Sequence, residues 1–173
     1  MTLAPPGANP ARAGFTLLEL LSVITIIALL AGIGIGAGRR AVESGKIARA
    51  KAELAVLGAA LENYKRSHGD FPRTDDGAQL LRALLGRRDP ATNTVIAGRA
   101  LIEPDRFTIA GEVLLDPWGR AYVYAYKTTS PWSNPRYVLY SAGPDGLENP
   151  RLLAGGFPDA GGEGNSDNIH ANH

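Results

Sequence analysis

The N-terminal part of the chain carries two different hydrophobic patterns in succession. From Leu17 to Gly38 almost every position is apolar or small, and Glu19 is the only charged side chain. A membrane-crossing helix needs about 20 predominantly apolar residues, so this run predicts a transmembrane helix. A secretory signal peptide is the alternative, but the apolar core of such a peptide spans only about 7–15 residues.

Beyond Gly38 the pattern changes to that of an amphipathic helix. Apolar residues recur at intervals of three and four, which places them on one face of a helix. This stripe consists of Ile47, Ala50, Leu54, Leu57, Leu61 and Tyr64. Gly69 and Pro72 follow and predict the end of the helix. The sequence therefore predicts one long N-terminal helix. Its half at 15–38 is expected to lie in lipid, and its half at 39–68 is expected to pack on a domain.

Shorter elements are expected in the remainder of the chain. Thr74 can cap a second helix that ends at Gly86 and has a leucine-rich apolar face. The segment 86–107 shows no clear pattern. Three strands are predicted, with a turn at Asp116-Pro117-Trp118-Gly119; they cover 112–115, 121–127 and 137–141. The predicted fold is α+β: a long N-terminal helix packed on a small antiparallel sheet, followed by a long C-terminal loop at 142–173.

Composition and charge exclude several classes of function. The 173 residues include 18 basic and 17 acidic side chains, for a net charge of +1, so we expect no nucleic acid partner. The absence of cysteine excludes disulfides and thiolate chemistry. The sequence offers no convincing serine–histidine–acid set, no phosphate-binding loop and no dinucleotide fingerprint. We therefore do not expect an enzyme.

Glu19 is unusual because it lies inside an apolar run. A carboxylate in hydrocarbon costs about 2.5–3.5 kcal/mol on insertion scales, so such a group normally has a partner and a function. The apolar run itself offers no cation. A free amine at a similar depth on another copy of the chain would neutralise the charge and fix the stagger between copies. This reasoning predicts that Glu19 takes part in assembly.

The residues around Glu19 are similar to a known processing signal. The stretch from Gly14 to Leu20, GFTLLEL, resembles the cleavage and methylation motif of type IV prepilins and type II secretion pseudopilins. The resemblance implies that a prepilin peptidase removes the leader 1–14 by cutting between Gly14 and Phe15, and methylates the new amine of Phe15. It also implies that Glu19 pairs with the terminal amine of a neighbouring subunit.

The globular part resembles the major pseudopilins of type II secretion systems. The similar residues are Tyr64-Lys65, the segment 71–77, the turn 116–119 with the tyrosine-rich segment after it, and 140–146. The resemblance implies a structural, type IV pilin-like subunit that polymerises from the bacterial inner membrane to help drive protein export. It implies a single pass at 15–38 and a periplasmic domain at 39–173.

The same resemblance implies several partners. They are other copies of the chain in a filament, minor pseudopilins, the inner-membrane secretion platform, the prepilin peptidase and membrane lipid. One alternative is a pilin of a type IV pilus or competence system. Another, of a different class, is a secreted or membrane-anchored binding or enzymatic domain behind an ordinary signal segment.

The C-terminal segment 142–173 is rich in glycine and acidic residues. The corresponding loop of the major pseudopilins binds calcium, and the resemblance implies ligands at Asp145, Asp167 and the backbone carbonyl of Ala142, with Asn168 as a further candidate. Calcium takes about six to eight oxygen ligands and tolerates irregular loops.

This loop is longer than the loop of that family. Asp159 and Glu163 are therefore alternative ligands for calcium. A solvated acidic tail is the other interpretation of the segment.

Overall fold

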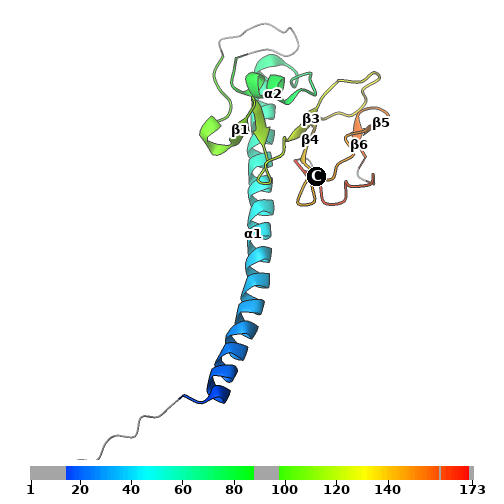
Figure 1. The fold of residues 1–173 in the computed structure, drawn as a ribbon. Coiled ribbons are helices and arrows are strands. Elements are labelled where there is room, and N and C mark those ends of the chain that lie inside the picture. The colour runs from blue at the N-terminus through cyan, green and yellow to red at the C-terminus, as the bar shows by residue number, and fades with distance from the viewer. Residues whose placement is uncertain (1–14, 88–97, 160, 172–173) are drawn as a thin grey trace, which may run out of the picture. The chain divides into compact units, whose positions relative to one another are not determined.

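The computed structural model describes residues 15–87, 98–159 and 161–171. The predicted leader 1–14 and residues 88–97, from the segment without a clear pattern, lie outside this part of the chain. The chain divides into two compact units, 1–41 and 42–173. Helix α1, Leu17–His68, contributes residues to both units (Figure 1).

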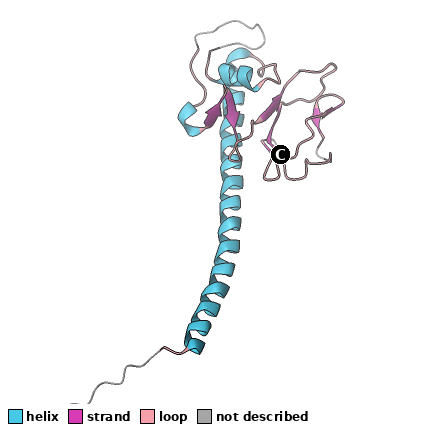
Figure 2. Ribbon diagram, viewed as in Figure 1, coloured by secondary structure: helices cyan, strands magenta, loops and turns pink. Residues whose placement is uncertain are grey.

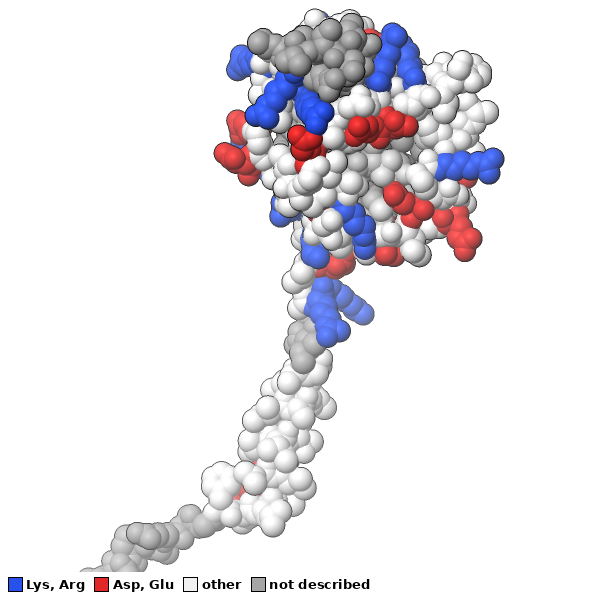
Figure 3. All heavy atoms as spheres, turned by 45° about the horizontal axis from the view of Figure 1, so that its top comes forward, with Lys and Arg blue, Asp and Glu red and all other residues white. Residues whose placement is uncertain are grey.

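In the first unit, α1 exposes an almost uncharged apolar surface. All residues from 15 to 32 are exposed, and Leu17 reaches 84%. Figure 3 shows this part of the helix nearly free of basic and acidic side chains. Among the residues whose side chains are described, which leave out 33–37, no helix is both long and apolar enough to cross a membrane. The predicted span at 15–38 is therefore not confirmed.

In the second unit, the predicted apolar stripe of α1 forms one side of the core. Ala50, Leu54, Leu57, Leu61 and Tyr64 are each at most 2% exposed. Partly buried Ile47 packs against the same core. The amphipathic prediction for this half of the helix is confirmed.

The end of α1 also follows the prediction. Gly69 adopts a φ of 82°, in the left-handed region that glycine enters without a steric penalty. Its N–H donates to the carbonyl of Lys65 at 2.7 Å, which satisfies one of the last carbonyls of the helix. The helix stops at His68 for this reason.

Helix α2, Gly77–Leu84, begins later than the sequence predicts. Its N-cap is Asp76, whose Oδ1 accepts a hydrogen bond from the N–H of Ala78 at 2.8 Å. Thr74, the predicted cap, instead accepts from the N–H of Asp76 at 2.9 Å and is buried. The Thr74 prediction was wrong because its hydroxyl closes a local turn that precedes the helix.

The strands form three small antiparallel sheets, shown in Figure 2. The three strands predicted from the sequence are confirmed as β2, β3 and β4. A short 3-10 helix, Pro104–Arg106, precedes the first sheet. The strands are β1 Thr108–Ala110, β2 Val113–Leu115, β3 Val123–Ala125, β4 Val138–Ser141, β5 Leu152–Leu153, β6 Phe157–Pro158 and β7 Ile169–His170.

The sheet order corrects the expectation of one sheet with an irregular tail. The first sheet is β1-β2, the second is β3-β4-β7, and the third is β5-β6. β7 returns from the C-terminal loop and pairs with β4, so that Ser141 lies opposite Ile169. Strands of two residues are too short to show an alternating pattern, which is why β5, β6 and β7 were not predicted. The α+β class is confirmed.

Candidate functional site

The first candidate site is the start of α1, in the first unit. Thr16 precedes the helix, and its hydroxyl accepts from the N–H of Glu19 at 3.2 Å. In return, Glu19 Oε2 accepts from the Thr16 N–H at 3.1 Å and from the Thr16 hydroxyl at 3.0 Å. This reciprocal arrangement is a capping box, which satisfies otherwise unpaired N–H groups at a helix start.

The capping box adds a local role for Glu19 that the sequence interpretation missed. A threonine followed three residues later by a glutamate, directly before an apolar run, is the signal that could have revealed it. Both bonds with Thr16 use Oε2. The carboxylate is thus held in one orientation while it stays exposed. Phe15 is also exposed, and Gly14 lies outside the described residues.

The second candidate site is the C-terminal loop, in the second unit. The structure brings together two of the predicted ligands, because the N–H of Asp145 donates to Asp167 Oδ2 at 3.1 Å. Asn168 follows Asp167 directly, and Ala142 is buried directly after the last residue of β4. A Cβ added at Gly143 would lie 2.4 Å from the carbonyl oxygen of Asp167, so glycine permits this close approach.

Among the described residues of this loop, two side-chain oxygen atoms are buried without a hydrogen-bond partner: Asp167 Oδ1 and Asn168 Oδ1. A buried polar atom that makes no bond costs about 1–3 kcal/mol, so such atoms call for a partner. Carboxylate, amide and carbonyl oxygens are the ligands that calcium prefers. The residues present therefore fit a calcium ion. Within the described part of the chain, no group of three or more His, Cys, Asp or Glu side chains could hold a metal. A site here thus needs amide and carbonyl oxygens as well.

The two alternative ligands lie differently. Glu163 is exposed. Asp159 contributes its backbone carbonyl, which accepts from Asn165 Nδ2 at 2.6 Å. Asn165 is only 7% exposed and was not singled out in the sequence, because its partners come from separate positions along the loop.

A hydrogen-bond network joins this loop to the turn at 116–119. Asp116 is buried, and its Oδ2 accepts from the Ser141 hydroxyl at 2.6 Å. The same hydroxyl accepts from the N–H of Gly143 at 3.2 Å, and Arg120 Nη1 donates to the carbonyl of Gly143 at 2.8 Å. Two segments singled out by resemblance, the turn and the end of β4, are therefore in direct contact.

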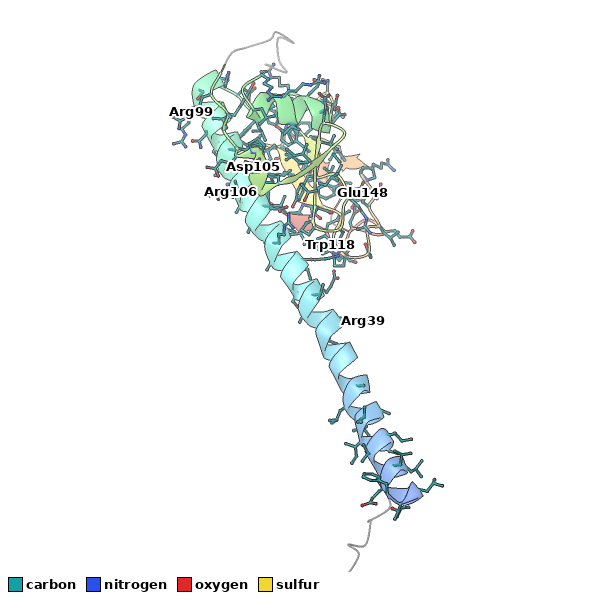
Figure 4. All side chains as sticks on the ribbon, turned by 60° about the vertical axis from the view of Figure 1, so that its left-hand side comes forward. Arg39, Arg99, Asp105, Arg106, Trp118 and Glu148 are labelled. Atoms are coloured by element: carbon teal, nitrogen blue, oxygen red, sulfur yellow. The ribbon has the colours of Figure 1, made fainter. Side chains whose placement is uncertain are left out.

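Trp118 belongs to the turn at 116–119 and Glu148 to the C-terminal loop; both are labelled in Figure 4. Trp118 is partly buried against the core, and its Nε1 donates to Glu43 Oε1 on α1 at 2.8 Å. Burial, reinforced by the neighbouring Glu148 carboxylate, raises the pKa of Tyr140 to about 12. The phenol of Tyr140 therefore stays protonated well into the alkaline range.

Comparison with known families identifies two matching segments of this chain. Residues 39–152 match the family described as type II secretion system (T2SS), protein G. Residues 9–35 match the prokaryotic N-terminal methylation motif. The chain belongs to the type II secretion system protein G family. The predicted resemblance to pseudopilins of type II secretion is thereby confirmed.

Relatives of this family member cover most of its length. The type II secretion system core protein G of Pseudomonas aeruginosa is 29% identical over 160 residues, or 91% of this chain and 96% of the relative. That of Escherichia coli K12 is 31% identical over 139 residues, or 80% and 86%. That of Klebsiella pneumoniae is 29% identical over 134 residues, or 78% and 86%. No solved structure matches the chain significantly.

The limits of the protein G match bear on the two candidate sites. The match includes Asp116 and Asp145 but ends at residue 152, before Asp167 and Asn168. The methylation match includes Gly14, Phe15 and Glu19. The residues predicted to take part in processing and assembly thus lie in a matched segment, whereas Asp167 and Asn168, two of the predicted calcium ligands, do not.

Proposed function

We propose that this chain is the major pseudopilin of a type II secretion system, a structural subunit and not an enzyme. The observation that carries the proposal is that one chain contains a methylation motif at 9–35 followed by a protein G match at 39–152. In this role the subunits polymerise from the bacterial inner membrane into a periplasmic pseudopilus that helps drive protein export. A subunit of a type IV pilus is less well supported, because the matched family is protein G.

The apolar surface of the first unit supports assembly in a membrane. A contiguous apolar surface on this scale marks an interaction site for lipid or for another protein. Exposed leucine and isoleucine side chains follow one another from Leu17 to Leu30. We infer that lipid covers this surface in the free subunit, with the domain at 39–173 in the periplasm, and that helices of other subunits cover it in the filament.

Processing would complete the assembly site. A prepilin peptidase would cut between Gly14 and Phe15, and the new amine of Phe15 would carry a positive charge beside the exposed apolar surface. Glu19 of a neighbouring copy would pair with that amine, since either charge alone is costly in lipid. The bonds from Thr16 hold the Glu19 carboxylate by one oxygen. Minor pseudopilins and the inner-membrane platform would be the remaining partners.

Mass spectrometry of the mature N-terminus tests the processing step. We expect the chain isolated from membranes to begin with N-methylated Phe15. A start near residue 38 would identify an ordinary signal segment and overturn the proposal.

Three variants separate the charge of Glu19 from its role in capping. Glu19→Ala should be inserted and cleaved but should form no filaments. Glu19→Gln is a sharper test, because glutamine also completes a capping box and removes only the charge. Thr16→Val keeps the charge and removes the hydroxyl of the box. We expect filaments to be lost in Glu19→Gln and retained, at a lower amount, in Thr16→Val; normal filaments from Glu19→Gln would refute the pairing.

We also propose that the C-terminal loop binds calcium. Asp145, Asp167, Asn168 and the backbone carbonyl of Ala142 would supply the oxygens. What supports this is the pair of buried oxygens without partners, Asp167 Oδ1 and Asn168 Oδ1. A bound cation would satisfy both atoms and would add a second link between the end of β4 and the start of β7, in addition to the pairing of Ser141 with Ile169.

Removal of calcium tests this part of the proposal. A ligand present at about 100 times its dissociation constant stabilises the folded chain by about 2.7 kcal/mol. For a domain of this size that corresponds to a melting temperature higher by about 5–10 °C. We expect EGTA to abolish this increment and magnesium to restore little of it, because magnesium requires a stricter geometry. An unchanged melting temperature would contradict the calcium site.

A further inference from the structure

Asn165 uses the full hydrogen-bonding capacity of its side-chain amide, and all of it within the C-terminal loop. Its Oδ1 accepts from the N–H of Asn149 at 2.8 Å and from Asn168 Nδ2 at 3.1 Å. Its Nδ2 donates to the carbonyl of Asn149 at 3.2 Å and to the carbonyl of Asp159 at 2.6 Å. An asparagine amide has two acceptor positions and two donors, so none is left over.

The bonds of Asn165 close a short hairpin at its base. Asn149 and Asp159 stand at the two ends of the segment that contains β5 and β6. Most of that segment lies beyond residue 152, where the match to the protein G family ends. Asn165 thus holds both ends of the hairpin from one side.

The other side of the hairpin rests on the loop before β4. The N–H groups of Ser133 and Asn134 both donate to the carbonyl of Gly155 at 2.9 Å. Asn134 Nδ2 donates to the carbonyl of Gly156 at 2.9 Å. A Cβ added at Gly156 would lie 2.4 Å from the indole of Trp132, so the hairpin backbone lies directly against that ring.

The third group that Asn165 holds is Asn168. Because Asn168 Nδ2 donates to Asn165 Oδ1, the amide of Asn168 is fixed in one orientation. In this orientation Asn168 Oδ1 is buried without a hydrogen-bond partner, and the preceding residue, Asp167, carries the other such oxygen, Oδ1. Asn165 therefore connects the hairpin base to one of the two oxygens that lack a partner.

We propose that Asn165 couples a divalent cation held by Asp167 and Asn168 to the ordering of the hairpin 149–159. The cation requires the Asn168 amide in the orientation that Asn165 imposes, and Asn165 imposes it only while it is itself fixed by Asn149 and Asp159. Linkage makes the effect reciprocal, so that cation binding stabilises the hairpin and a closed hairpin raises cation affinity. This inference rests on the calcium proposal and not on filament assembly.

Calcium titration of the purified full chain in detergent tests the coupling. Removing a residue that orients a metal ligand costs about 10–100-fold in metal affinity, and we expect a loss in this range for Asn165→Ala by calorimetry. Hydrogen exchange measured by mass spectrometry should show that calcium slows exchange across 148–161 in the unmodified chain. The same segment should show no calcium-dependent protection in Asn165→Ala.

Two further variants separate the parts of the coupling. Asn165→Asp keeps an acceptor for Asn168 Nδ2 but removes both donors to the hairpin carbonyls, so calcium should still bind, more weakly than to the unmodified chain, and should not protect 148–161. Asn134→Ala loosens the hairpin from its other side only, and calcium affinity should change less than in Asn165→Ala. This pair also keeps the test valid if Asn165→Ala fails to fold.

The outcomes distinguish the two levels of the proposal. No calcium binding by the unmodified chain would overturn the cation site and this coupling together. Calcium binding with equal affinity in Asn165→Ala would leave the site in place and overturn the coupling alone. Calcium protection limited to 142–147 and 165–169, with none in the hairpin, would also refute it.

Discussion

The turn at 116–119 and the C-terminal loop both contain polar oxygens shielded from water, but only the turn satisfies all of them within the chain. Asp116 Oδ1 accepts from the N–H groups of Trp118 and Arg120, at 3.0 and 2.9 Å, and its Oδ2 accepts from the Ser141 hydroxyl. In the loop, Asp167 Oδ2 has one partner, while Asp167 Oδ1 has none.

This difference separates a structural carboxylate from a candidate ligand. A buried carboxylate that accepts hydrogen bonds from three donors of the chain requires no water or cation as a further partner. Its contribution to stability should therefore not depend on ions. A buried oxygen without a donor is costly until a cation or another donor reaches it. The turn should therefore be equally stable with calcium and with EGTA, and the loop should not.

The largest effect is expected for Asp116→Ala. Three donors would lose their acceptor in a buried site, and each costs about 1–3 kcal/mol, so we expect a loss of at least about 3 kcal/mol in the free energy of unfolding. Urea denaturation in calcium and in EGTA measures it. The loss should be the same in both conditions. Asp105→Ala, at an exposed position labelled in Figure 4, is the control and should change stability by less than about 0.5 kcal/mol.

The next effect concerns the residue where the two regions meet. Gly143 has a φ of 68°, and a Cβ there would collide with the Asp167 carbonyl. Gly111 has a φ of 58° and no atom within 4 Å of an added Cβ. Alanine at Gly111 should cost only the backbone strain, about 1–2 kcal/mol. Alanine at Gly143 should cost about 1–3 kcal/mol beyond that strain.

Calcium sharpens the comparison between the two glycines. Because Gly143→Ala displaces Asp167, it should also remove the difference in melting temperature between calcium and EGTA. Gly111→Ala should keep that difference. Equal losses of stability from both substitutions, with calcium stabilisation intact, would show that the close approach at Gly143 has no role in the loop.

The elements that the sequence predicted well depend on neighbours along the chain. The stripe from Ala50 to Tyr64 repeats every three to four residues, and Gly69 ends the helix wherever the chain goes next. The three predicted strands, β2, β3 and β4, have β-rich runs and a proline–glycine turn between the first two. Even here one detail failed, since Thr74 and Asp76 are equally good caps in sequence and only the fold selects Asp76.

The candidate sites were predicted less completely because they depend on contacts that folding creates. The resemblance predicted Asp145 and Asp167 as ligands of one ion, and the structure brings them into contact although many residues separate them, while calcium binding itself stays a prediction. Asn165 was missed, since its role arises only when Asn149, Asp159 and Asn168 gather around it. The capping box at Thr16 was readable in the sequence, but the charge of Glu19 had been assigned entirely to a partner subunit.

Asp70 is a second carboxylate that accepts several hydrogen bonds within the chain, at a partly exposed position. Partial burial alone would raise the pKa of Asp70, but hydrogen bonds from Lys127, Tyr126, Arg73 and the Phe71 N–H outweigh it and hold this pKa well below its usual range. A carboxyl whose pKa is lower in the folded chain stabilises it above the unfolded pKa of about 4, and this contribution is lost as the pH falls further.

Asp70→Asn should therefore change the pH dependence of stability. At pH 7 we expect the variant to be less stable by on the order of 1 kcal/mol, a figure that allows for solvent screening of a partly exposed group. Below about pH 4 the difference in stability should shrink, because the carboxyl of Asp70 takes up a proton in the unfolded chain before it does so in the folded chain. Denaturant unfolding at several pH values measures this. Glu103→Gln, in an ion pair exposed on both sides, should follow the unmodified chain at every pH.

The smallest effect without calcium should come from Asp145→Ala, and this variant divides the two regions most clearly. Asp145 is exposed, and its Oδ1 accepts from the N–H of Leu147 at 2.8 Å, so its removal in EGTA should cost only about 0.5–1 kcal/mol. In calcium the variant also loses a charged ligand, and its melting temperature should fall well below that of the unmodified chain. Asp116→Ala should show the opposite behaviour, a large loss that calcium does not change. If Asp145→Ala lost the same small amount in both conditions, the carboxylate of Asp145 would serve only the local turn, and the calcium ligands would have to come from Asp167, Asn168 and the backbone.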